Sequence, residues 1–186
     1  MEEKEELKAR NARVDRENRI TRYQGIFKTI MEEQDRSAER IEDGIDFKSI
    51  TLDGGVKISY VEHGVTAKSI ESEDKPRDQL RLALEYLVYH WTDEIGNKLY
   101  LEKGVARAPK KLKLKYDRKT GMLTHYAISG VETIDGDVSY TWFQSMWLPI
   151  YERESEILEK IFDEAWLYIK GIRKEENLFK PEGEEE

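Results

Sequence analysis

One short segment of the chain concentrates positive charge at a spacing that suits phosphate binding. Between positions 103 and 119 eight residues are basic and only Asp117 is acidic, a local net charge of +7. If this segment is a β-strand, Lys111, Lys113 and Lys115 share one face at intervals of about 6.6 Å, close to the spacing of successive phosphates. We expect this face to bind nucleic acid or another polyanion, helped by three further basic residues: Arg107, Lys110 and Arg118.

Other interpretations of this segment need no nucleic acid. A sheet with one solvated face also alternates lysine with leucine, and lysines on an exposed edge strand discourage pairing with other chains. The lysines could instead dock an acidic segment, and positions 175–186 hold six glutamates and one lysine. This acidic tail is predicted to be disordered, and salt would weaken its attraction to the lysines.

A second basic pattern lies near the N-terminus, where arginine recurs at every third position: Arg10, Arg13, Arg16, Arg19 and Arg22. In an α-helix this spacing turns successive side chains by about 60°, so the five sweep about 240° around the axis. They form no flat surface for a phosphate backbone, and acidic residues four positions away offer weak ion pairs. The pattern favours a solvated helix with internal ion pairs. A partner helix and direct contact with nucleic acid are the alternatives.

Aromatic residues gather in TWFQSMWLPIY, positions 141–151, just before the last expected helix. Bulky aromatics at such a junction are typical of a sheet sealed against its helix, which predicts core positions for Trp142, Phe143, Trp147 and Tyr151. The alternative is an exposed platform on which a partner packs or nucleic-acid bases stack.

Signals for catalysis or metal binding are weak. The chain has no cysteine, and no nucleotide-binding or zinc-protease motif occurs. His90 lies four residues before Glu94, a helical spacing that suits a metal or acid–base pair, but no second histidine is near. The triplet EDK at 73–75, with Asp53 upstream, superficially resembles the ExK of PD-(D/E)xK metal nucleases, although that family sets it in a hydrophobic strand. No catalytic residue, metal or cofactor is predicted.

A predicted α+β domain positions these residues. The stretch from Glu2 to Ile41 has no proline and one glycine, which predicts a long N-terminal helix. Alternating apolar residues around Asp53-Gly54-Gly55 predict a hairpin, and His63-Gly64 predicts a turn into a third strand. Apolar spacing predicts a central buried helix over 76–95, and Pro149 leads into a C-terminal helix packed on the sheet. We expect an antiparallel sheet, or two, with about six to seven strands.

The long first helix divides into two parts of different character. Residues 1–19 hold few apolar side chains and are predicted to be a charged helical arm, whereas 20–174 form a single α+β domain and 175–186 the tail. From position 20 an apolar stripe must pack on something, and we expect a partner or a second copy to cover it. The predicted interface residues are Ile20, Tyr23, Phe27 and Ile30. On the last helix four acids lie opposite the apolar face, where solvent is expected: Glu152, Glu156, Glu159 and Asp163.

Composition limits the class of protein. The 186 residues suit one domain, and 38% charged residues exceeds the roughly 25% that is usual. A formal net charge of −8 argues against a general nucleic-acid-coating protein but leaves room for a local basic site. No long apolar run occurs, so we expect a cytoplasmic protein without a membrane segment. Four Asn and four Gln beside abundant Lys and Glu suggest a thermophile.

These features favour a non-enzymatic binding or assembly protein that engages nucleic acid or another polyanion through its lysine-rich strand. One alternative is a structural protein that self-associates through the N-terminal amphipathic helix. Another is a metal-dependent hydrolase or nuclease built from Asp53 and Glu73, or around His90 and Glu94. The expected partners are nucleic acid or an acidic protein segment, with a homo-oligomer formed through the N-terminal helix.

Overall fold

A computed structural model of the chain describes residues 2–95, 106–133 and 140–173. Its helices, in chain order, are α1 (Glu2–Glu32), α2 (Ser37–Glu42), α3 (Asp78–Tyr89), the π-helical turn η1 (His90–Ile95) and α4 (Glu152–Ile169). Its strands are β1 (Ile45–Leu52), β2 (Val56–Glu62), β3 (Thr66–Ser72), β4 (Ala106–Tyr116), β5 (Leu123–Thr133), β6 (Tyr140–Gln144) and β7 (Leu148–Pro149).

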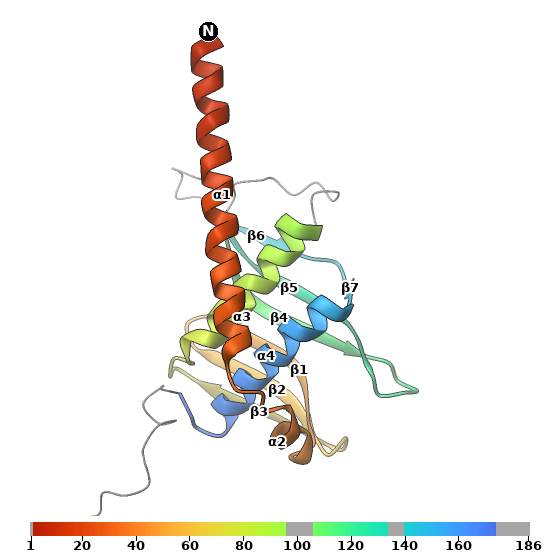
Figure 1. Cartoon of the computed structure of the whole chain (residues 1–186). Coiled ribbons are helices and arrows are strands. Elements are labelled where there is room, and N and C mark those ends of the chain that lie inside the picture. The colour runs from red at the N-terminus through yellow and green to blue at the C-terminus, as the bar shows by residue number, and fades with distance from the viewer. Residues whose placement is uncertain (1, 96–105, 134–139, 174–186) are drawn as a thin grey trace, which may run out of the picture.

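Within the described ranges the seven strands form one antiparallel sheet in the order β3-β2-β1-β4-β5-β6, and β7 pairs with β5. The three longest helices, α1, α3 and α4, lie on one side of this sheet (Figure 1). The α+β prediction is therefore confirmed, including the long N-terminal helix, the central buried helix and the C-terminal helix that packs on the sheet.

The N-terminal helix is shorter than the prediction, which ran to Ile41. α1 ends at Glu32, and the short helix α2 follows after a turn. Hydrogen bonds from the side chain and backbone of Ser37 lower the pKa of Asp35, whose carboxylate accepts the Ser37 N–H at 2.8 Å. The Arg36 backbone N–H donates to Asp163 of α4 at 3.1 Å. Local Asp and Ser hydrogen bonding and one tertiary bond thus override the helical propensity of this stretch.

Both predicted turns between the first strands are present. Asp53 to Gly55 joins β1 to β2, and Gly54 there has a φ of 67°. His63 and Gly64 join β2 to β3 with φ of 52° and 69°. Two successive residues in the left-handed region are the mark of a turn whose twist matches that of the paired strands.

The later strands extend the first sheet, so no second sheet forms in the described part of the chain. β4 pairs with β1, which sets Ser49 opposite Lys113 and Thr51 opposite Lys111, and its other side pairs with β5. β4 is therefore a central strand. The interpretation of its lysines as protection of an exposed edge is wrong, because β4 has no free edge over this stretch.

The central helix begins two residues later than Pro76 suggests. Arg77 is extended, with φ −59° and ψ 149°, and α3 starts at Asp78. At its other end α3 continues into η1, where the Thr92 hydroxyl donates to the Val88 carbonyl oxygen at 2.9 Å. The sequence also predicts a helix end at Gly96, a strand at 98–102 and a turn at Asp135-Gly136, and these three features lie outside the described residues.

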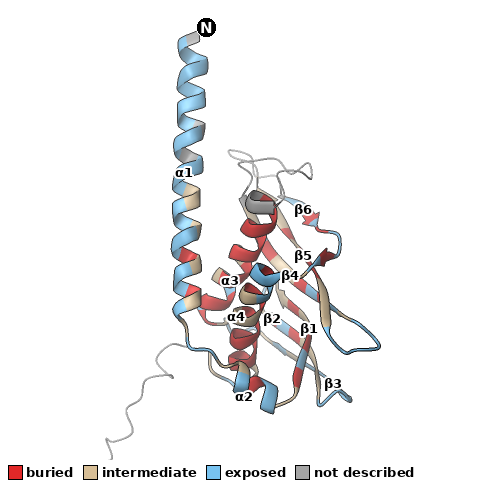
Figure 2. Ribbon diagram, turned by 45° about the vertical axis from the view of Figure 1, so that its right-hand side comes forward, coloured by how far each residue is buried: buried red, intermediate tan, exposed pale blue. Residues whose placement is uncertain are grey.

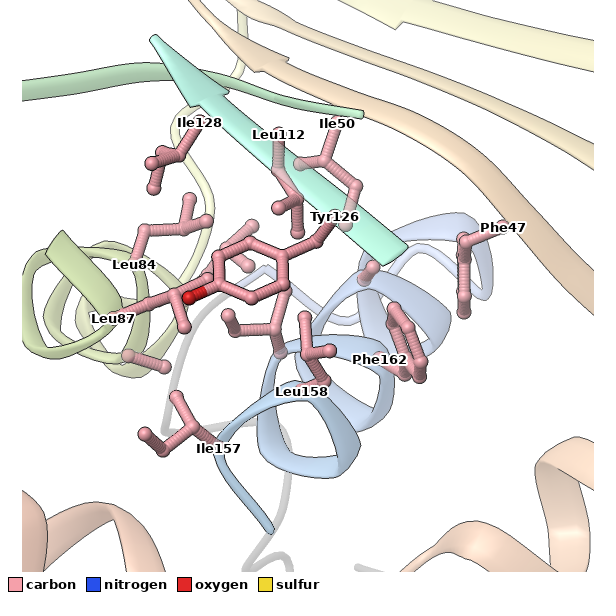
Figure 3. Close-up of a cluster of buried hydrophobic side chains, with 14 of the residues drawn as sticks. Phe47, Ile50, Leu84, Leu87, Leu112, Tyr126, Ile128, Ile157, Leu158 and Phe162 are labelled. Atoms are coloured by element: carbon pink, nitrogen blue, oxygen red, sulfur yellow. The ribbon is translucent and has the colours of Figure 1, made fainter. Parts of the chain in front are cut away.

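The hydrophobic core fills the layer between the sheet and the helices (Figure 2). Tyr126 of β5 is one of its largest side chains and lies among Leu84 and Leu87 of α3 and Leu158 of α4 (Figure 3). Burial raises the pKa of the Tyr126 hydroxyl, so this ring stays neutral in the apolar layer. The core therefore uses one face of the sheet, and none of the helices in the described ranges covers the other face.

The second half of α1 packs on α3. Tyr23 stacks on Tyr89 with ring centroids 4.2 Å apart, and Phe27 lies against Tyr86 at 4.9 Å. Ile30 is fully buried, and Ile20 is half-buried. The stripe that is predicted to meet a partner or a second copy thus places most of its apolar surface against the chain's own core, which leaves little of it for another molecule.

Replacing Gly25 with alanine should raise the free energy of unfolding by about 0.5–1 kcal/mol. Gly25 lies within α1 on its exposed side, and a methyl group there would meet no heavy atom within 4 Å. Alanine therefore restricts the unfolded chain without straining the folded one. Chemical denaturation followed by circular dichroism measures the change, and a destabilised variant would contradict an open environment at this position.

Candidate functional site

The open face of the sheet carries the predicted lysine row. Lys111, Lys113 and Lys115 alternate along β4 with Leu112 and Leu114, which are buried against the helices. The lysine side chains therefore project from the opposite side, where Lys113 and Lys115 are exposed and Lys111 is half-buried. We call Lys111, Lys113 and Lys115 the lysine file.

Lys111 and Lys113 have small, uncharged neighbours in the sheet, whereas Lys115 lies opposite His125 of β5. Lys111 lies between Thr51 and Ser129, and Lys113 lies between Ser49 and Ala127. Directly opposed residues of an antiparallel pair share one face, so these neighbours flank the ammonium groups. Among the residues that the structure describes, no carboxylate forms an ion pair with the three lysines. The file is thus a row of like charges without compensation inside the described chain.

The other basic residues predicted for this site are not part of the file. A bulge between Pro109 and Lys111 shifts the register of β4, so that Arg107 faces Glu132 and points to the helix side. Its guanidinium is almost fully buried and donates to Glu132 at 2.8 Å. Lys110 is the residue at the bulge, and Arg118 lies in the turn after β4. The inclusion of Arg107 in a surface site is therefore wrong, because its charge is buried and paired.

Two tryptophans that are predicted to be core residues are exposed on the open face. Trp142 of β6 is 65% exposed and lies opposite Val131, one row further along the open face. Trp147 is 43% exposed, and the Lys115 ammonium lies 5.7 Å from the centre of its ring. Phe143 is buried, as predicted, and stacks on Trp91 at 6.0 Å. Tyr151 is exposed at the start of α4.

Further residues of the open face are not among those predicted from the sequence. Lys57 of β2 lies opposite Thr51 and extends the positive charge, although Glu71 of β3 pairs with it at 3.8 Å. Gln144 of β6 lies opposite Ser129 and adds an amide next to the file. Alternation within β2 and β6 assigns Lys57 and Gln144 to the open face only when the order of the strands in the sheet is known.

The arginine series lies on α1, where no single surface collects it. Arg10, Arg13, Arg16 and Arg22 are exposed, and Arg19 is half-buried. Arg13 pairs with Glu17 at 3.9 Å, and Arg22 pairs with Glu85 of α3 at 3.7 Å. The first pair is internal to α1, as expected for a solvated helix, whereas the second joins α1 to α3.

The histidines and the acidic triplet do not assemble a metal centre in the described part of the chain. His90 is buried and its Nε2 lies 2.9 Å from a carboxylate oxygen of Glu154 on α4. The tip of the first hairpin meets residues 73–75 beside a surface hollow, where Gly55 approaches the Ser72 carbonyl oxygen. No three His, Asp or Glu side chains gather there as a metal ion would need.

A second charged cluster is buried between the helix ends. The Arg77 guanidinium, just before α3, donates to Glu164 of α4 at 3.0 Å and to Glu33, just after α1, at 3.3 Å. Arg40 of α2 pairs with Asp163 at 3.4 Å and also with Glu159. Burial raises the pKa of Asp163, and that of Glu164 to about 7. This cluster joins four helices to one another, and the hollow beside Glu33, Asp163 and Glu164 has a volume of only about 10 Å³, enough for a water molecule but not for a substrate.

Comparisons with protein-family models, with curated proteins and with solved structures find no match to this chain. Across the described residues, no helix combines the length and apolar character that a membrane span requires.

Proposed function

We propose that the open face of the sheet binds single-stranded nucleic acid, with the lysine file along the phosphates and the exposed tryptophans against the bases. The observation that carries this proposal is the uncompensated lysine file on a central strand. In the sheet, Lys111 and Lys113 are flanked by hydroxyl and methyl groups and Lys115 lies opposite His125, so no carboxylate occupies a position paired with the file. A polyanion is the ligand that removes the mutual repulsion of such a row.

The tryptophans favour nucleic acid over other polyanions. Trp142 exposes most of its indole to solvent, so the free energy of burying this apolar surface is gained only when another group covers it. Stacking of a base on an exposed aromatic ring contributes about 1–3 kcal/mol and suits any base. A single strand leaves its bases free for such stacking, whereas a duplex does not. The combination therefore supports sequence-tolerant binding of single strands.

Fluorescence anisotropy with labelled single-stranded DNA and RNA across a salt series tests the proposal. Replacing Lys111 and Lys113 with glutamine should weaken binding about tenfold near 100 mM salt, and the slope of log K against log salt should become shallower by about 1.4. The matched control is Lys28→Gln with Lys75→Gln, which removes the same charge from exposed positions away from the open face. This control should bind like the wild type.

Trp142→Ala separates stacking from charge. Affinity should fall by about 1–3 kcal/mol for single strands while the salt slope stays unchanged. Equal weakening in the Lys28/Lys75 control would mean that only net charge matters, and no binding at low salt would overturn the proposal. If the protein binds an acidic peptide of sequence 175–186 but no oligonucleotide, the open face docks an acidic protein segment and the nucleic-acid proposal is wrong.

A further inference from the structure

The N-terminal half of α1 projects from the rest of the described chain. From Glu3 to Asn18 every residue whose side chain is described is exposed, and Figure 2 shows this part of the helix standing clear of the body. An isolated helix of this length is marginally stable in water, because nothing is buried to offset the cost of ordering its backbone. The arm therefore presents a whole helical surface to another molecule.

One stripe of this arm has the spacing of a two-stranded coiled coil. Leu7, Asn11, Val14, Asn18 and Thr21 follow one another at intervals of four, three, four and three residues. Leu7 is 57% exposed and Val14 is 42% exposed, so both apolar side chains of the stripe lack cover. This alternation is the a/d repeat that keeps one seam facing a partner helix.

The stripe lies on the side of α1 that faces away from the body. At about 100° per residue, its mean direction is roughly 140° from that of the residues that pack on α3, such as Tyr23, Ile26 and Ile30. Gly25 continues the stripe towards the body, and a methyl group at this position would have nothing within 4 Å. A second helix can therefore lie along the stripe without meeting α3.

We infer that residues 3–22 join two copies of this chain through a parallel, in-register coiled coil. In that arrangement Leu7 meets Leu7 of the partner subunit and Val14 meets Val14 of the partner subunit. Each asparagine meets its own equivalent, and an Asn pair at an a position is known to fix parallel register and a dimeric state. An antiparallel pair would instead set Leu7 and Val14 against asparagine amides, leaving polar groups poorly bonded beside apolar ones.

Flanking charges support the same parallel register. Residues at g and at the following e′ position, five further on, meet across a parallel seam. Glu3 then opposes Lys8 of the partner subunit, and Glu17 opposes Arg22 of the partner subunit. Both pairs have opposite charges. This inference does not depend on the nucleic-acid proposal.

Sedimentation velocity of the full chain from about 5 to 200 µM tests the dimer. The wild type should sediment increasingly as a dimer, and Leu7→Ser with Val14→Ser should be a monomer throughout. Ala9→Ser with Arg16→Ser is the matched control, since both positions lie away from the seam, and it should dimerise like the wild type. A monomeric wild type at 200 µM, or a dimer that survives the Leu7/Val14 change, would overturn the inference.

A cysteine cross-link tests the orientation, because the chain has no cysteine of its own. Asn11→Cys should form a disulfide-linked dimer under mild oxidation, since position 11 meets its equivalent only in the parallel register. Arg16→Cys, outside the seam, should cross-link far less. A dimer by sedimentation that fails to cross-link through position 11 would refute the parallel arrangement. Circular dichroism of each variant confirms that the α+β domain, which this arm does not build, stays folded.

Discussion

Replacing Arg77 with alanine should lower the free energy of unfolding by about 3–5 kcal/mol at pH 8, and by much less at pH 5. The Arg77 guanidinium is 6% exposed and holds Glu164 at 3.0 Å and Glu33 at 3.3 Å. Its removal takes away the positive charge that acts most strongly on the buried Glu164 carboxylate. The ends of α1, α3 and α4 meet at this point, so the loss affects the packing of all three helices.

The pH dependence follows from the protonation of Glu164. Burial raises its pKa to about 7 from an ordinary value of 4.5, although the positive charge of Arg77 opposes this shift. Between pH 4.5 and 7 the native state holds a proton that the unfolded chain has released, so the wild type loses stability as pH rises through this window. Without Arg77 the native pKa lies higher, and the loss continues to higher pH. The difference between variant and wild type must therefore grow with pH.

Urea denaturation at pH 5 and pH 8 measures both effects. Adding Glu164→Gln to Arg77→Ala should recover part of the stability at pH 8, because the uncompensated carboxylate is gone. Arg81→Ala is the matched control: Arg81 is half-exposed and pairs with Glu85 at 2.6 Å, so its loss should cost less than about 1 kcal/mol at either pH. An Arg77→Ala loss of equal size at both pH values would contradict the role given to Glu164.

Gly130→Ala should destabilise the protein by about 3 kcal/mol or more, or prevent folding. Gly130 of β5 lies opposite Pro109, where the bulge brings β4 unusually close. A Cβ atom at Gly130 would overlap the Ala108 carbonyl oxygen and would lie 3.0 Å from the Lys110 backbone nitrogen. Both are backbone atoms, so no side-chain rotation can relieve the overlap, and the two strands must separate.

The same denaturation experiment gives the cost of Gly130→Ala. Gly25→Ala is the internal comparison, because the same chemical change at an open helical position should stabilise the protein. If Gly130→Ala lost less than about 1 kcal/mol, β4 and β5 could part at the bulge with little cost, and the close approach would not restrain the sheet.

Local patterns explain most of the secondary structure that could be predicted. Gly54 and Gly64 have the positive φ that their turns require, so the glycine positions alone predict both hairpins. The apolar spacing of α3 and α4 reflects their single buried faces. The alternation of Lys113 with its leucine neighbours likewise predicts a strand with one wet face. Each of these signals lies within a few residues of sequence.

The remaining features depend on contacts between distant segments. The β1–β4 pairing brings Ser49 beside Lys113, and no local pattern encodes that pairing. The bulge at Lys110 reverses the side to which Arg107 points, so counting alternate residues from the lysine file fails there. Asp163 was expected in solvent opposite the apolar face of its helix, but Arg40 of α2 covers it and leaves it 4% exposed.

The prediction that Trp142 and Phe143 both lie in the core conflicts with strand geometry. Adjacent residues of a strand point to opposite faces, so Trp142 and Phe143 could not both be in a core that covers one side of the sheet. Phe143 occupies the core and Trp142 is exposed. Strand alternation alone therefore predicts that one of these two aromatic side chains is exposed.

The placement of the lysine file on β4 determines how far the protein can change shape when a ligand binds. The leucines between the lysines are fixed in the core, and β4 is paired on both sides from Lys111 to Lys113, so the backbone there cannot adjust without opening the sheet. Adaptation to a ligand is limited to the lysine stems and the tryptophan rings. A ligand should therefore bind to a rigid, preformed surface, with little ordering of the protein and a small change in heat capacity. The association rate should depend on ionic strength.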